Sequence, residues 1–260
     1  MAELVTLQRV KDHIAILKLC REEKANAMSQ ALLEQLNDKI LIIKQDPSFY
    51  CAIIHGEGVK AFCAGADLKE RKRMSDKEVI RAVQYIGNTV DSIEKLEIPV
   101  IAAINGAAFG GGLELALACD MRIASRTAML GLTETSLAII PGAGGTQRLP
   151  RLIGAGQAKR LIYTAQPITA EEAYAIGLVE VLVEQEHLVE RALSVAEKIA
   201  GNGPLALRQA KLAINKGSDM NLAAGLLVEH QAYKETISTK DRTEGLLAFS
   251  EKRKPTYKGM

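Results

Sequence analysis

The segment from residue 98 to residue 120, IPVIAAINGAAFGGGLELALACD, most constrains what this chain can fold into. Its apolar start is followed by glycines at 106, 110, 111 and 112 and then by a stretch rich in Ala and Leu. This order predicts a strand, a glycine turn and a helix. Glycines let the backbone approach a ligand, and the unpaired N–H groups at a helix start attract negative charge. We therefore expect a ligand site at this junction.

Glu114 is the unusual residue of this predicted helix. Its neighbours at 113 and 115–118 are apolar, so the helix should be buried, and a carboxylate inside it requires an explanation. One explanation is structural, because an acid near a helix N-terminus is stabilised by about 0.3–1 kcal/mol. The other explanation is catalytic. On this segment alone, both remain open.

The same succession of strand, turn and helix recurs over about 180 residues, and the rest of the chain is helical. Ser29, Asp67 and Thr169 are the expected helix N-caps. Expected strands are 4–9, 13–19, 51–55, 98–104, short strands within 122–132, and 177–183. Expected helices are 29–45, 67–73, 77–96, one from 144 or 146, 156–165, one from 169, 188–199, 205–215, 222–236 and 240–251. The pattern predicts an α/β protein with a core at 1–200 and a helical C-terminal region at 201–260.

Net charge and cysteine usage narrow the expected partners and compartment. Lys and Arg number 33 and Asp and Glu 31, so a formal charge of +2 gives no general attraction to nucleic acids or membranes. No apolar run is long enough to span a bilayer, and the start lacks a basic-then-apolar leader. The four cysteines form no C-x-x-C pair. We expect an intracellular protein, cytoplasmic or, after removal of a transit peptide, in the mitochondrial matrix.

The absence of several well-known motifs argues against nucleotide-binding, serine-nucleophile and zinc sites. The loose dinucleotide pattern at 56–61 is not followed by a helix, and no Gly-Lys-Ser/Thr or G-x-S-x-G sequence occurs. The four histidines lack triad or zinc-ligand spacing, so no metal site is expected. Three acids remain beside glycine turns: Asp67, Glu114 and Glu134. Two acids held together in an apolar site can act as acid and base at neutral pH, although spacing does not show that they converge.

Four blocks of the sequence resemble the enoyl-CoA hydratase/isomerase, or crotonase, superfamily. They are CAGADLKE at 63–70, INGAAFGGGLELALACD at 104–120, TETSLAIIPGAGGTQRLPRLIG at 133–154 and EKRKPTYKG at 251–259. The resemblance implies a spiral of β-β-α units that binds an acyl-CoA thioester. It also implies a homotrimer or a dimer of trimers, in which the region 201–260 mediates assembly and completes the coenzyme A site.

The resemblance implies a role for each of several residues. The backbone N–H groups of Ala66 and Gly111 would polarise the thioester carbonyl as an oxyanion hole. Glu114 would take a proton from the water that attacks C3, and Glu134 would give a proton to C2. Substrate-binding positions implied in the same way are Lys24, Ala25, Ala27, Ala64, Asp67, Leu68, Pro141, Gly142, Phe249 and Lys252. No cofactor is expected, because coenzyme A is part of the substrate.

The presence of both glutamates favours a hydratase, because isomerases of the superfamily commonly lack one of the pair. The blocks are most similar to the branch of AU-binding methylglutaconyl-CoA hydratases, so isomerisation and AU-rich RNA binding are the alternatives. The first helical segment, 26–44, contains two lysines and two acids, so its net charge is zero. We therefore expect no strong nucleic-acid binding. We expect the acyl pocket to be lined by helices after Lys77 and near Leu226, with no residue that indicates a second carboxylate site.

Overall fold

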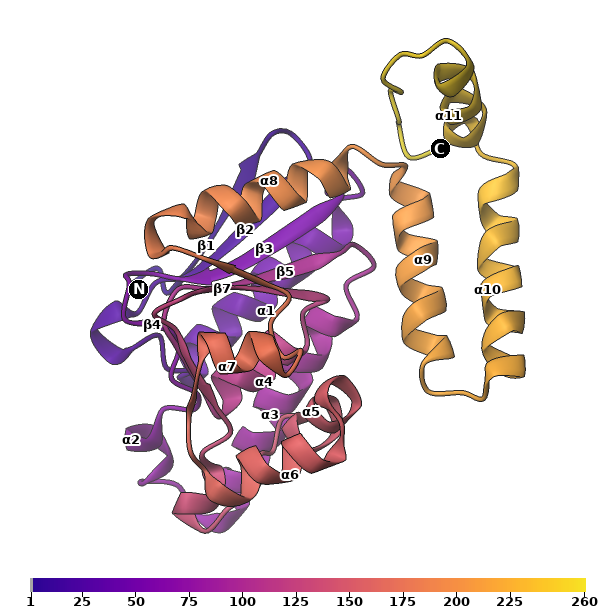
Figure 1. Cartoon of the computed structure of the whole chain (residues 1–260). Helices are drawn as coiled ribbons and strands as arrows, with labels where there is room; N and C mark the ends of the chain where they lie inside the picture. The colour runs from indigo at the N-terminus through magenta and orange to yellow at the C-terminus, as the bar shows by residue number, and fades with distance from the viewer. Residues whose placement is uncertain (1) are drawn as a thin grey trace.

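Two β-sheets form the core of the computed structural model, which describes residues 2–260 (Figure 1). In the larger sheet the strand order is β1 (Val5–Val10), β2 (Ile14–Leu19), β3 (Cys51–Gly56), β5 (Val100–Ile104), β7 (Met121–Ser125) and β10 (Val181–Val183). In the smaller sheet it is β4 (Ala61–Cys63), β6 (Ala107–Phe109), β8 (Met129–Gly131) and β9 (Ile168–Thr169). The pairs β1–β2 and β8–β9 are antiparallel, and the other pairs are parallel.

A repeating β-β-α unit generates both sheets. In each consecutive pair, β3–β4, β5–β6 and β7–β8, the first strand joins the larger sheet and the second joins the smaller one. Helices α2 (Leu68–Arg71) and α3 (Asp76–Glu94) follow the first pair, α4 (Gly111–Leu117) the second, and η2 (Glu134–Leu137) and α5 (Gly145–Ile153) the third. The α/β prediction is confirmed.

Helices cover both faces of the larger sheet, which explains why its central strand β5 is apolar and buried throughout. Alternate side chains such as Ile53 and Ile101 pack on α8 (Leu188–Ala200), whereas Ile54 and Ala102 belong to the cluster shared with α1 (Gln30–Gln45), α3 and α4. The remaining core elements are η1 (Glu22–Lys24), α6 (Ala155–Thr164), α7 (Ala170–Ala175) and η3 (Gln185–His187). Ser29, Asp67 and Thr169 cap α1, α2 and α7 as predicted.

The last three helices extend away from the sheets (Figure 1). They are α9 (Pro204–Gly217), α10 (Leu222–Ile237) and α11 (Lys240–Ser250), close to the predicted ranges. Where α9 and α10 meet, Gly217 and Gly225 lie against each other, and a Cβ added to Gly225 would be in ordinary contact with the Gly217 carbonyl oxygen, at 3.4 Å. Lys211 joins α9 to the core through Asp120, at 2.7 Å. No helix among residues 2–260 has the length and apolar character needed to cross a membrane.

Three sequence predictions needed correction. A short strand, β6, separates β5 from the following helix, because residues 107–109 pair with β4 and β8 instead of forming a simple glycine turn. Helix α2 ends at Arg71 and not near Arg73, since the next helix starts soon after, at a Ser75–Glu78 capping box. Strand β10 begins at Val181, because the left-handed Gly177 places the preceding residues in a turn.

Candidate active site

The smaller sheet brings three strand-to-helix junctions together. Strands β4, β6 and β8 are parallel neighbours, so their carboxyl ends meet at one edge of the sheet. Ala66 follows β4, Gly111 follows β6, and Glu134 follows β8. All three line one cavity of about 600 Å³, together with Glu114. The structure thus provides the convergence that residue spacing could not show.

Two glycines allow helix α4 to begin against this sheet edge. Gly110 has φ +50° and ψ −124°, a backbone conformation that side chains rarely tolerate. A Cβ added to Gly112 would lie 1.9 Å from the carbonyl oxygen of Cys63 on β4. The glycine run therefore permits both the sharp turn and the close packing of α4 on β4.

Two backbone N–H groups border the cavity without a partner in the described chain. A Cβ added to Gly111 would lie 3.8 Å from the nitrogen of Ala66, so the two junctions are in contact. Among residues 2–260, neither the Ala66 nor the Gly111 N–H donates a backbone hydrogen bond. Fixed donors of this kind can stabilise negative charge on an oxygen placed between them.

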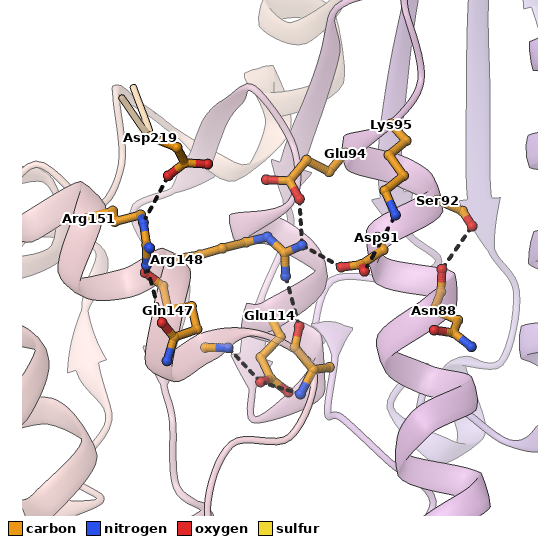
Figure 2. A network of polar contacts seen from close by, with 12 residues as sticks. Asn88, Asp91, Ser92, Glu94, Lys95, Glu114, Gln147, Arg148, Arg151 and Asp219 are labelled. Carbon is orange, nitrogen blue, oxygen red and sulfur yellow. Dashed lines mark hydrogen bonds and ion pairs between the residues drawn. The ribbon is translucent and has the colours of Figure 1, made fainter. Parts of the chain in front are cut away.

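Glu114 is buried, with 2% of its surface exposed, and its Oε1 is fixed by the chain (Figure 2). This oxygen accepts hydrogen bonds from Ala143 N at 2.7 Å and Gly145 N at 2.8 Å, at the start of α5. Burial raises the pKa of Glu114, and the two N–H donors oppose the rise by stabilising the carboxylate. Glu114 therefore lies in the first turn of α4, and its side chain contacts the N-terminal end of a second helix, α5.

Glu134 occupies a different environment on the 3₁₀ helix η2. Burial, reinforced by the negative charge of Glu114, raises the pKa of Glu134 to about 7. Its Oε2 is buried and has no hydrogen-bond partner among the described residues. A buried carboxyl oxygen of this kind is available to a ligand. The two glutamates thus have distinct environments, as an acid and a base require.

Arg148 stabilises the loop that holds Glu114 (Figure 2). Its Nη1 donates to the Ala143 carbonyl oxygen at 2.9 Å, and its Nη2 contacts Asp91 at 2.7 Å and Glu94 at 2.6 Å. The N–H of the same Ala143 donates to Glu114. The chain of contacts from α3 through Arg148 to Glu114 was not predicted, because Asp91 and Arg148 are 57 residues apart.

The strand-to-helix segment after β4 also meets the segment after η1. Ala64 N donates to Ala25 O at 3.0 Å, and Met28 N donates to Gly65 O at 2.7 Å. Asp67 caps α2 and pairs with Arg21 at 2.8 Å. Of the other predicted contact positions, Ala64, Leu68 and Gly142 line the cavity, whereas Lys24 and Asp67 line a neighbouring groove. Ala27 directly precedes Met28, which bonds to Gly65, and Pro141 is buried beside Gly145.

The structure does not bring all predicted positions together within one chain. Phe249, on α11, is 86% exposed, and neither it nor Lys252 lines the cavity formed by the described residues. Helix α3 lines the cavity through Val79, Val83 and Ile86, whereas Leu226, which was also expected there, does not line it. Missed cavity residues are Arg71, Leu137, Ile139 and Ile140. Among residues 2–260, no group of three or more His, Cys, Asp or Glu side chains could hold a metal ion.

The chain matches the profile of the enoyl-CoA hydratase/isomerase family over residues 9–260. YngF of Bacillus subtilis (strain 168), whose name is that of an enoyl-CoA hydratase/isomerase, is 53% identical over 260 residues, covering 100% of both chains. The mitochondrial methylglutaconyl-CoA hydratase of Mus musculus is 49% identical over 250 residues, covering 95% of this chain and 80% of the relative. The crystal structure of an enoyl-CoA hydratase from Bacillus anthracis has 54% identity and a TM-score of 0.98, covering 99% of this chain and 100% of that chain.

Proposed function

Because the chain belongs to the enoyl-CoA hydratase/isomerase family, which acts on acyl-CoA thioesters, we propose that it hydrates the 2,3 double bond of a 2-enoyl-CoA. The observation that carries this proposal is a pair of glutamates, Glu114 buried and Glu134 half-buried, beside two unpaired backbone N–H groups in one cavity. The acyl group would be a short enoyl chain or the 3-methylglutaconyl chain named for several relatives.

The two N–H groups would bind the thioester oxygen. When water adds to C3, negative charge moves from the double bond to this oxygen, and donors from Ala66 and Gly111 stabilise it. Each such donor contributes about 10²- to 10³-fold in rate in enzymes where one has been removed. Since both donors belong to the backbone, substitution of the Ala66 side chain leaves them in place.

The two glutamates would divide the proton transfers. Glu114, whose Oε1 is already held by two N–H groups, would accept the proton of the attacking water as its oxygen bonds to C3. Glu134, with a pKa of about 7, would donate its proton to C2. One proton is gained by Glu114 and one is lost by Glu134, so exchange with solvent or between the acids resets the site. No cofactor is required.

Isomerisation is the second candidate, because relatives carry both activities in their names. Moving a double bond requires one base to shuttle a proton, whereas adding water uses an acid and a base together. Retention of both glutamates at the cavity supports hydration. AU-rich RNA binding is not part of this proposal.

Substitution of each acid tests the assignment. We expect Glu114→Gln and Glu134→Gln each to lower kcat for crotonyl-CoA hydration by about 100-fold or more, the range of a general acid or base. Circular dichroism should show that both variants are folded. A parallel assay with 3-enoyl-CoA measures isomerisation. Wild-type hydration rates in both variants would contradict the mechanism, and efficient isomerisation without hydration would favour the second candidate.

We also propose that the C-terminal region 201–260 mediates assembly into trimers or pairs of trimers. Large side chains on α10 and α11 are exposed in the single chain, including Leu222 (78%), Leu227 (73%) and Phe249 (86%), and such patches favour an interface. Phe249 and Lys252 would then contact coenzyme A in a neighbouring subunit. Truncation after Thr239 should lower both the mass measured by light scattering and the affinity for coenzyme A. A fully active monomer would contradict this proposal.

A further inference from the structure

Arg71 is the last residue of the short helix α2, which begins directly after Ala66 and its cap, Asp67. It is half-buried and lines the same cavity as Ala66, Glu114 and Glu134. It also lines an adjoining cavity of about 490 Å³, which shares Ala66 and Ile86 with the first. Arg71 and Ala66, which carries one of the two N–H donors, therefore border both cavities.

The surroundings of Arg71 on this side are apolar. The other large side chains of the cavity wall are hydrocarbon, namely Leu68, Val79, Val83, Ile86, Leu137, Ile139 and Ile140. Among the described residues that line this cavity, Arg71 is the only base, and the only acids are Glu114 and Glu134. A simple hydrocarbon acyl chain would contact the apolar residues but would offer no hydrogen-bond acceptor to the guanidinium of Arg71.

The guanidinium of Arg71 is in direct contact with no carboxylate of residues 2–260, although its charge acts on Glu114 and Glu134 across the cavity. Across residues 2–260 it forms neither an ion pair nor a side-chain hydrogen bond, whereas Arg148 contacts two carboxylates. The acids nearest along the chain are already engaged: Asp67 pairs with Arg21, Glu70 accepts from Gln30 N, and Glu78 accepts from Ser75 N. An anionic group of a ligand that entered the cavity could therefore pair directly with this half-buried guanidinium.

The basic residues around α2 are divided between two surfaces. Lys69 and Arg73, four residues apart, line an open groove together with Arg21 and Lys24, and Arg71 does not line that groove. Three acids, Glu34, Asp67 and Glu70, line the same groove, so its charge is mixed. Arg71 lines the cavity of the two glutamates instead, and its positive charge lowers the pKa of both Glu114 and Glu134. Among these basic residues, Arg71 alone borders that cavity.

We propose that Arg71 is a specificity-determining residue that selects a 2-enoyl thioester whose acyl chain ends in a carboxylate. This inference rests on the proposed hydratase function and defines its substrate class. The planar guanidinium can donate two parallel N–H bonds to a terminal carboxylate, while the apolar wall contacts the intervening carbons and any methyl branch. The sequence alone indicated no second carboxylate site, because Arg71 follows Lys69 and precedes Lys72 and Arg73 in an ordinary charged run.

A matched substrate pair tests this selectivity. Glutaconyl-CoA ends in a carboxylate, and 5-methyl-2-hexenoyl-CoA has an isopropyl group of similar shape in its place. We expect Arg71→Met to lower the ratio of their kcat/KM values by about 10- to 100-fold, as for lost charge-assisted hydrogen bonds. Arg71→Lys should give an intermediate ratio. Lys72→Met removes a neighbouring exposed charge that lines neither cavity, and it should leave the ratio unchanged.

Binding of the saturated analogues separates this inference from the hydratase proposal. Calorimetry should show that wild-type protein prefers glutaryl-CoA to 5-methylhexanoyl-CoA and that Arg71→Met loses this preference. If neither enoyl substrate is hydrated, the proposed function fails, but the binding preference still decides the role of Arg71. Equal losses for the charged and the neutral ligand in Arg71→Met, in rate and in binding, would overturn the inference.

Discussion

The loop after Pro141 and the turn that carries Glu134 border the same cavity, but they treat a buried carboxylate in opposite ways. The loop supplies two N–H donors to Glu114 and is itself held by Arg148. The turn leaves Glu134 Oε2 buried without a partner among the described residues. One region fixes an acid in place, and the other keeps an acid available for its ligand. Similar side chains can therefore perform different tasks because the neighbouring backbone differs.

The largest expected effect concerns the protonation of Glu134. Its pKa of about 7 means that the donor form is lost as the pH rises above neutrality. If Glu134 donates the proton to C2, kcat/KM should fall about 50-fold between pH 7 and pH 9. A profile of kcat/KM against pH, measured with crotonyl-CoA well below its KM, checks this expectation. The alkaline limb should disappear in Glu134→Gln, and its persistence there would assign it to another group.

Removal of Arg148 should make the loop that holds Glu114 less rigid, and so make the environment of Glu114 more like that of Glu134. Arg148→Met leaves the Ala143 carbonyl, Asp91 and Glu94 without their shared donor. We expect a loss of about 2–3 kcal/mol in the free energy of unfolding. We also expect kcat to fall at least about tenfold, because Glu114 is less firmly positioned. Urea denaturation and steady-state kinetics measure the two effects.

Arg151 provides the control for Arg148 within α5. It is largely exposed and pairs with Asp219 at 3.4 Å, away from the Ala143 carbonyl. Arg151→Met should therefore change the free energy of unfolding by about 0.5 kcal/mol or less. Equal effects of the two substitutions would show that the loop does not depend on Arg148.

The smallest expected effect is the change in the free energy of unfolding that the ionisation of Glu134 causes. Because the pKa of Glu134 is raised from 4.5 to about 7, the folded state retains a proton that the unfolded chain releases between these values. The stability contributed by this group is complete below about 4.5 and is lost as pH rises through about 7. Glu134→Gln should then raise the free energy of unfolding at pH 8 by on the order of 1–2 kcal/mol, allowing for partial solvent screening.

The pH dependence of this gain distinguishes it from a general packing effect. At pH 5 the variant and the wild type should differ little in urea denaturation, because Glu134 is then mostly protonated in the folded state. A gain of equal size at both pH values would indicate that ionisation of Glu134 is not its cause.

Local sequence features predicted the elements of the site better than their assembly. Apolar neighbours marked Glu114 as buried, and Ser29 and Asp67 were recognisable caps because capping depends on a few adjacent residues. Strand β6 was missed because it is three residues long and exists through pairing with β4 and β8. The roles of Arg71 and Arg148 could not be predicted, because the residues that surround each of them in the structure are distant in the sequence. Periodicity and local motifs carry no information about such contacts.

The repeating β-β-α unit has a consequence for how this architecture can change its chemistry. The first repeat supplies the Ala66 donor, the second supplies Gly111 and Glu114, and the third supplies Glu134 and the loop that positions Glu114. Under the proposed function, polarisation of the thioester would need two repeats, while the second acid would come from the third. An altered turn after β8 could then replace that acid without changing the two N–H donors. The architecture would in this sense be modular, with thioester binding kept constant while the proton chemistry diverges.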